Sequence, residues 1–185
     1  MSASPILRGA PVPVHGLHHT AYRCRDAEET RHFYEDILGL PLVHVIKADS
    51  VPSTGENHPY VHLFFEFQDG SCIAFFDLGD DQAAIPSPNT PKWVTHIAFR
   101  VESLDELSRA KARLQQAGID VLGEVDHHFV HSIYFFDPNG VRLELTCEVG
   151  PPSYGEEKRR SAHAELSAWT EEKARIRAAR PLPAH

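Results

Sequence analysis

Two histidines occupy the same position in two copies of a short motif, and this pair is the first sign of chemistry in the chain. The stretch from His19 to Cys24 reads H-T-A-Y-R-C, and the stretch from His96 to Val101 reads H-I-A-F-R-V. A repeated pattern of this kind indicates two similar structural units. If the two units pack face to face, the imidazoles of His19 and His96 can converge on one point. Imidazole is the commonest metal ligand in proteins, so a metal site is worth seeking.

The repeat continues towards the end of each half. Residues 69–75 align without gaps on residues 139–145, and both segments contain a turn with glycine followed by an apolar stretch. In this register Ala74 of the first half corresponds to Glu144 of the second half. The two halves therefore share an architecture but differ in the side chain at one chemically important place.

Composition limits the classes of protein that remain. At 185 residues the chain is one domain or two small fused modules, with 42% apolar and 24% charged residues, as is ordinary for a soluble globular protein. The formal net charge of −8 argues against a nucleic-acid partner. No apolar run is long enough to span a membrane, and the N-terminus lacks a signal-peptide pattern, so we expect a cytoplasmic protein. Its three cysteines lie in apolar, strand-like runs and are expected to be buried reduced thiols.

The expected elements follow one order, strand-helix-strand-strand-strand, and this order occurs twice. In the first half we expect strands at 17–24, 42–46, 60–67 and 71–78 and a helix between Asp26 and Gly39; in the second half, strands at 94–101, 121–124, 131–136 and 142–147 and a helix from Ser103 to about residue 117. Asp26 and Ser103 are suitable N-caps, and Gly39 and Gly118 are suitable stops.

Five segments follow from this reading. They are an irregular N-terminal arm at 1–14, a first module at 15–79, a linker loop at 80–92, a second module at 93–150 and a helical tail at 151–185. Within the tail, Glu156 to Ala179 reads as an amphipathic helix. We expect this helix to dock on its own chain or to contact a second copy.

The paired modules and three motifs resemble the vicinal oxygen chelate superfamily, which includes glyoxalase I, fosfomycin- and bleomycin-resistance proteins and type I extradiol dioxygenases. The motifs are H-x-A-[YF]-R at 19 and 96, F-Y-x-D-I-L-G at 33–39 and D-P-N-G-x-x-L-E at 137–144. The resemblance covers about residues 16 to 148. It implies an α+β fold in which the curved sheets of two βαβββ modules form a half-open barrel around one metal.

The resemblance also implies the metal ligands. They are His19, His96 and Glu144, while the fourth ligand position of the superfamily falls on Ala74, which cannot ligate. Two histidines and one carboxylate with open coordination positions form the facial triad of non-haem Fe(II) oxygenases. We therefore expect Fe(II), with Mn(II), Zn(II) and Ni(II) as alternatives. Ala74 disfavours isomerases like glyoxalase I, which use four protein ligands, but leaves three-ligand fosfomycin-type enzymes open.

The same resemblance implies the candidate catalytic residues. Tyr134 stands ten residues before Glu144, as a tyrosine does in extradiol enzymes, and would hydrogen-bond a substrate oxygen. His127 or His128 would be an acid/base group near that strand. At the position where extradiol relatives carry another histidine this chain has Ser71, and we expect His62 to replace it.

The leading hypothesis is an Fe(II)-dependent extradiol dioxygenase in aromatic compound degradation. Its partners would be a small aromatic diol, O2 and a second copy of the chain in a homodimer, with no nucleic acid and no membrane. Two alternatives stay open. One is a metal lyase, isomerase or thiol transferase of the same fold; the other is a binding or resistance protein that sequesters a small molecule without catalysis.

Overall fold

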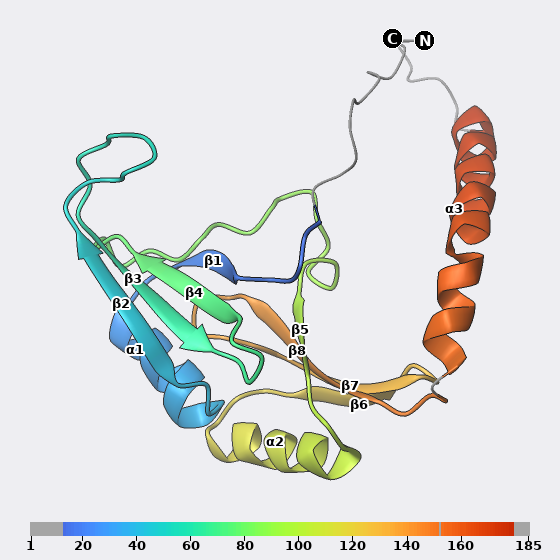
Figure 1. Cartoon of the computed structure of the whole chain (residues 1–185), viewed down its shortest axis with the longest axis horizontal. Helices are drawn as coiled ribbons and strands as arrows, with labels where there is room; N and C mark the ends of the chain where they lie inside the picture. Colours follow the sequence, from blue (N-terminus) through green and yellow to red (C-terminus); the bar gives the residue numbers. More distant parts are fainter. Residues whose placement is uncertain (1–12, 152, 180–185) are drawn as a thin grey trace.

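The computed structural model describes residues 13–151 and 153–179, so the predicted N-terminal arm lies almost wholly outside the described residues. The fold is α+β, as predicted, with two four-stranded mixed sheets that each carry a helix (Figure 1). Among the described residues, no helix is both long and apolar enough to cross a bilayer.

The first module contains every element that the pattern predicts for it. The elements are β1 (His19–Cys24), α1 (Ala27–Arg31), η1 (His32–Ile37), β2 (Leu42–Ala48), β3 (Tyr60–Glu66) and β4 (Cys72–Asp77). The side chain of Asp26 accepts a hydrogen bond from the backbone N–H of Glu29, which confirms Asp26 as the N-cap. The apolar spacing did not reveal that the second half of this helix is a π-helix, η1.

The second module repeats the arrangement. Its elements are β5 (Ile97–Arg100), α2 (Leu104–Gln116), β6 (Leu122–Asp126), β7 (Val130–Phe136) and β8 (Arg142–Glu148). Ser103 caps α2 by accepting the N–H of Glu106, and the carboxylate of Glu106 accepts the N–H of Glu102. The pair differs from a capping box in that Glu106 accepts from the residue before the N-cap, but together the two bonds fix the start of the helix.

Strand pairing reproduces the repeat seen in the sequence. The sheets have the orders β1-β4-β3-β2 and β5-β8-β7-β6, and in each sheet the first strand runs parallel to the last. Phe64 faces Ala74 across β3 and β4, and Tyr134 faces Glu144 across β7 and β8. Ala74 and Glu144 are therefore equivalent positions in three dimensions as well as in the alignment.

One hydrophobic core serves both modules. It joins the helix-covered face of each sheet, and its fully buried members include Tyr34, Phe65, Phe75, Ile133, Phe135 and Leu143. Two buried hydrogen bonds cross between the modules within it. The hydroxyl of Tyr34 donates to Asp137 at 2.9 Å, and the amide of Asn139 donates to the Thr30 hydroxyl at 3.1 Å. The F-Y and D-P-N-G motifs thus fasten the first helix to the last turn.

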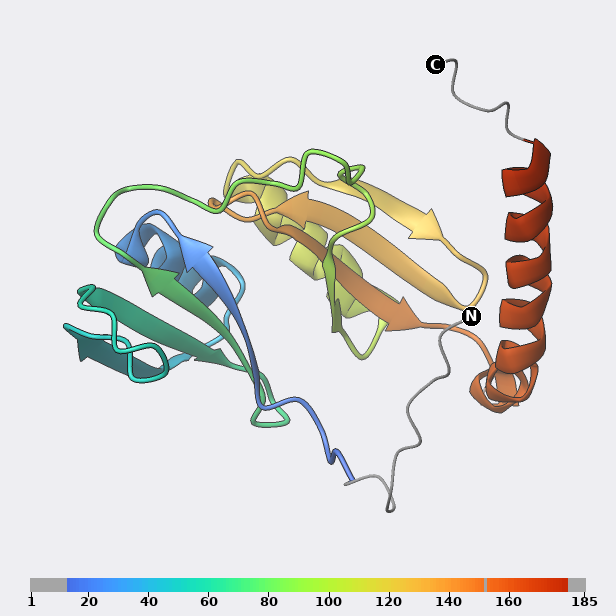
Figure 2. The ribbon, with the colours of Figure 1, turned by 90° about the horizontal axis from the view of Figure 1, so that it is seen from above.

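The helix-free faces of the two sheets, meaning the faces opposite the shared core, do not form a barrel in this chain. Figure 2 shows the two sheets next to each other, and no strand of one sheet pairs with a strand of the other. The two sheets are therefore not closed into a barrel within the described chain. The reason is that the modules meet through their helix-covered faces and the contacts of Tyr34 and Asn139.

The tail forms one long helix, α3 (Ser153–Ala179), that extends away from both sheets (Figure 1). The ring of Tyr154 stacks on Phe129 with the centroids 4.7 Å apart, which anchors the start of the helix. Farther along, Leu166, Trp169 and Ile176 are exposed. The helix therefore does not dock on its own chain in this structure.

Candidate metal and catalytic site

His96 and Glu144 lie together on the helix-free face of the second sheet. His96 directly precedes β5, Glu144 is in β8, and Nε2 of the imidazole is 3.1 Å from Oε2 of the carboxylate. Glu144 is only 7% exposed. On its other side the His96 ring lies with Nδ1 3.1 Å from the carbonyl oxygen of Val94.

These contacts test whether a cation fits. A carbonyl can only accept, so Nδ1 of His96 carries the proton, and in the neutral ring Nε2 then presents a lone pair to Glu144. Two acceptors at 3.1 Å need a proton or a metal ion between them. A histidine whose second nitrogen donates to a backbone carbonyl is also the usual arrangement of a metal-ligating histidine. The pair therefore fits as two donors of a metal site.

Tyr134 and His127 extend this pair into a row. The hydroxyl of Tyr134 donates to Oε1 of Glu144 at 3.2 Å and lies 2.9 Å from Nε2 of His127. Burial, followed by the negative charge of Glu144, raises the pKa of Tyr134. The phenol is therefore a proton donor at neutral pH. Four residues predicted from the sequence thus lie in one hydrogen-bonded row, His127–Tyr134–Glu144–His96.

The turn before β7 decides which of the two neighbouring histidines reaches the site. His128 has a positive φ of 72°, and its N–H donates to the side chain of Asp126. This turn orients His127 towards Tyr134. The structure gives His128 no hydrogen bond to Tyr134, so the two candidates are not equivalent.

His19 and His62 lie on the other sheet. Their ring centroids are 6.0 Å apart, and the His19 ring is 5.4 Å from that of Phe64. His62, the predicted replacement for the histidine missing at Ser71, occupies the face of the first sheet that is equivalent by pseudo-symmetry to the face of Tyr134 in the second. It does not contact Tyr134 in this chain.

His62 itself is an unusual histidine. It is 7% exposed, it stacks on Phe76 with centroids 3.6 Å apart, and its Nε2 is buried without a hydrogen-bond partner. Desolvation, aided by the nearby imidazoles of His19 and His44, lowers the pKa of His62 to about 4. The ring is therefore neutral at pH 7, and its Nε2 is left to exchange a hydrogen bond with a ligand.

The three predicted metal ligands are not assembled in one place. Within residues 13–151 and 153–179, no three His, Cys, Asp or Glu side chains gather closely enough to hold a metal ion. The idea that His19 and His96 converge within one chain is therefore wrong for this arrangement. Each lies on the helix-free face of its own sheet, and those faces do not meet. The chain supplies a two-donor half-site and, separately, the third donor.

Sequence reasoning missed Arg142, which lies beside the row. Its guanidinium carbon is 4.4 Å from the centroid of the Tyr134 ring, and one of its nitrogens donates to the carbonyl of Trp93 at 2.8 Å. The signal was available. Arg142 stands two residues before Glu144 in the same strand, and residues two apart in a strand share a face.

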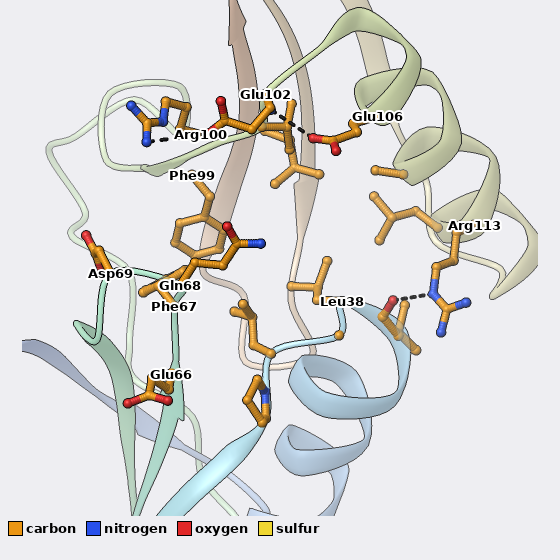
Figure 3. Close-up of a pocket in the computed structure, with 18 residues that line it drawn as sticks. Leu38, Glu66, Phe67, Gln68, Asp69, Phe99, Arg100, Glu102, Glu106 and Arg113 are labelled. Carbon is orange, nitrogen blue, oxygen red and sulfur yellow. Dashed lines mark hydrogen bonds and ion pairs between the residues drawn. The ribbon is translucent and has the colours of Figure 1, made fainter.

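A cavity of about 720 Å³ lies elsewhere. Figure 3 shows it between the modules, where Leu38, the turn with Asp69, Phe99 and helix α2 surround it. Two of its charged groups are already engaged, since Arg113 donates to the backbone carbonyls of Asp36 and Ile37, and Glu106 accepts the N–H of Glu102. None of the predicted site residues lines it, so it is a gap between packed modules rather than the centre of the chemistry.

Comparison with known proteins agrees with the fold and the motifs. Residues 16–145 match the family described as Glyoxalase/Bleomycin resistance protein/Dioxygenase superfamily. The chain is 26% identical over 171 residues to "Glyoxylase I 4" of Arabidopsis thaliana, covering 85% of this chain and 87% of the relative.

Two other relatives are named as ring-cleaving enzymes. "Putative ring-cleaving dioxygenase MhqA" of Bacillus subtilis is 26% identical over 146 residues, covering 77% of this chain and 43% of the relative. "Biphenyl-2,3-diol 1,2-dioxygenase 3" of Rhodococcus globerulus is 29% identical over 118 residues, covering 63% of this chain and 54% of the relative. The chain thus spans about half the length of these two.

Solved structures with the same fold include a glyoxalase/dioxygenase from Nostoc punctiforme, at 25% identity and a TM-score of 0.57, covering 80% of this chain and 100% of that one. A second is a glyoxylase/bleomycin resistance protein/dioxygenase domain from Frankia sp. EAN1pec, at 19% identity and a TM-score of 0.60, covering 74% and 100%. The family match covers most of the chain, and the chain belongs to the Glyoxalase/Bleomycin resistance protein/Dioxygenase superfamily.

Proposed function

We propose that this protein is an Fe(II)-dependent ring-cleaving dioxygenase that acts on a catechol-type aromatic and works as a homodimer. The observation that carries the proposal is the row His127–Tyr134–Glu144–His96 on one sheet face. It combines a carboxylate–imidazole pair with a phenol donor, which suits oxygen chemistry at a metal. The two relatives named as ring-cleaving enzymes support the same reaction class.

The metal site requires a third donor, and we assign it to His19 of a second copy. Within one chain His19 lies with His62 on the first sheet, away from His96 and Glu144. A two-fold dimer that places the first sheet of each copy over the second sheet of the other would build two identical sites. Exposed Ile46, which pairs with His62 on the first sheet, is apolar surface that such a contact would cover. Iron held there would supply Lewis acidity and access to O2 chemistry.

Each remaining residue has a role that its contacts define. The Tyr134 hydroxyl donates its one proton to Glu144 in this structure, and with Glu144 on a metal that proton would go instead to a substrate oxygen that gains negative charge. His127, rather than His128, exchanges the proton through that hydroxyl. His62 accompanies His19 into the site, where its buried, unpartnered Nε2 would hydrogen-bond a catechol hydroxyl; because its pKa is lowered to about 4, the ring is too weak a base to keep the catechol proton at pH 7.

Ala74 favours this reaction over a four-ligand isomerase. It faces Phe64 in the first sheet as Glu144 faces Tyr134 in the second. The place where the isomerases carry a carboxylate is therefore filled by a methyl group against an aromatic ring. Open coordination positions follow, which a substrate and O2 need.

The test is oxygen uptake by anaerobically purified, Fe(II)-loaded protein with a panel of mono- and bicyclic catechols. We expect about one O2 per substrate, because both atoms enter the ring-opened product, and a yellow colour. Glu144→Ala should abolish uptake and metal retention, while Arg109→Gln on exposed α2 should leave both unchanged. No uptake from any catechol, with iron bound, would reject the dioxygenase. Turnover without O2 consumption would favour a lyase or isomerase.

A further inference from the structure

We propose that Arg142 binds an anionic substituent of the substrate, so that the preferred substrate is an aromatic ring that carries a carboxylate. This inference rests on the proposed function, because it uses the same sheet face. It adds the chemical class of the substrate and the residue that selects it.

The position of Arg142 makes it part of the site. It lies in β8 two residues before Glu144, and its guanidinium stands 4.4 Å from the centre of the Tyr134 ring. The Trp93 carbonyl accepts one of its N–H groups at 2.8 Å, which holds the side chain in place. A guanidinium has five N–H donors, so most of them remain for a ligand.

Arg142 forms no ion pair with a carboxylate of the described residues. The ion pairs found among residues 13–151 and 153–179 involve other cations of the chain. A positive charge held beside an active-site phenol without a counter-ion is suited to an anion from outside. The planar fork of arginine also matches a carboxylate with two parallel hydrogen bonds.

The internal repeat shows that the fold does not need an arginine here. Arg142 pairs with Phe136 in the second sheet, and the equivalent pair in the first sheet is Cys72 with Glu66. Cys72 is a small buried residue at the same place in the same kind of strand. Glu144 behaves in the same way, because its counterpart in the first sheet is the small residue Ala74. At these two positions of the last strand, the sheet that carries Tyr134 has Arg142 and Glu144, whereas the first sheet has Cys72 and Ala74.

The surroundings suit an aromatic acid. Leu122, which is 64% exposed, pairs with Tyr134, and Trp93, which is 68% exposed, supplies the carbonyl that holds Arg142. Apolar surface of this kind accepts a ring, while the guanidinium accepts the charge. The whole chain has a net charge of −8 and would repel an anion, so a local cation is needed to bind one.

The experiment measures binding to the full-length protein by calorimetry without O2. Benzoate is compared with benzamide on metal-free protein, and 3,4-dihydroxybenzoate is compared with catechol on Fe(II)-loaded protein. The carboxylated member of each pair should bind about 10- to 100-fold more tightly, as one charge-assisted pair allows. Added salt should weaken only that member. Arg142→Gln should remove the preference, Arg142→Lys should retain part of it, and Arg109→Gln should leave it intact.

The outcomes separate this inference from the dioxygenase. Benzoate preferred by the wild type, with no oxygen uptake from any catechol, would support the anion site and reject the reaction. Catechol turned over with equal affinity for its carboxylated form would overturn the anion site and leave the reaction standing. Equal weakening of neutral and anionic ligands in Arg142→Gln would also overturn it, since the arginine would then only pack on Tyr134. If Arg142→Gln does not fold, the wild-type comparison of benzoate with benzamide decides alone.

Discussion

Replacing Tyr134 by phenylalanine removes one hydroxyl from the centre of the site and nothing else. That hydroxyl donates to Glu144 at 3.2 Å and lies 2.9 Å from Nε2 of His127. The ring, and the Arg142 guanidinium 4.4 Å from its centre, would stay in place. The variant therefore isolates the oxygen-facing donor from the packing around it.

The size of the effect differs between catalysis and stability. Loss of one donor to a developing oxyanion lowers turnover by roughly 10²–10³. Loss of a hydrogen bond at a half-exposed position lowers the free energy of unfolding by only about 0.5–1.5 kcal/mol. For a chain of this size that corresponds to a fall in melting temperature of a few degrees. Metal content should not change, since Tyr134 is not a ligand.

The assay compares oxygen uptake, iron content and thermal unfolding for Tyr134→Phe and for Tyr22→Phe. Tyr22 is the matched control, because it is a tyrosine of the first sheet whose ring packs on Phe75. Turnover should fall in Tyr134→Phe and stay near the wild-type value in the control. Wild-type turnover in Tyr134→Phe would refute the oxyanion role, and loss of iron would show that the hydroxyl instead helps to hold Glu144.

Three further predictions concern the scaffold. Tyr34→Phe removes a buried donor to the Asp137 carboxylate and should lower the free energy of unfolding by about 1.5–3 kcal/mol in urea denaturation, while an unchanged value would remove Tyr34 from the inter-module contact. Burial raises the pKa of Asp137, so the native state favours the protonated form and loses stability as pH rises through that pKa; the stability of the wild type relative to Asp137→Asn should therefore decrease from about pH 4 towards pH 7. A chain ending at Gly150 lacks α3 and should still unfold cooperatively and dimerise through its sheets, but its dimer should dissociate at a higher protein concentration than that of the full chain, because exposed Trp169 and its apolar neighbours would no longer contact a second copy; unchanged dissociation would exclude α3 from the interface, and a truncated chain that is monomeric at all concentrations would contradict the contact between the sheets.

The local features of this fold could be predicted because short-range physics decides them. Asp26 and Ser103 cap helices because their side-chain oxygens accept backbone N–H groups of the first turn. The alternation of side chains along the strands places Tyr134 and Glu144 on one face. The equivalence of Ala74 and Glu144 followed from a gapless repeat, and strand pairing reproduces it. The sequence predicted that His127 or His128 would lie near Tyr134. The structure places His127 in contact with Tyr134, and the turn at His128 distinguishes the two histidines.

The relation between the modules could not be predicted in the same way. Each module has the same strand pattern whether its helix-free face meets the other module or a second chain. The deciding contacts join residues far apart, such as Tyr34 with Asp137, and the motifs that contain them had suggested only a family. Arg142 went unpredicted for a different reason, since an arginine that is always protonated neither ligates a metal nor transfers a proton.

The most direct test of the account is a heterodimer of His19→Ala and Glu144→Ala chains, purified through a different tag on each. Either variant alone should neither retain iron nor consume O2. In the heterodimer one of the two sites regains His19 from one copy and His96 with Glu144 from the other, so about half of the wild-type iron and oxygen uptake should return. A heterodimer as inactive and iron-free as its parents would contradict a site shared between copies.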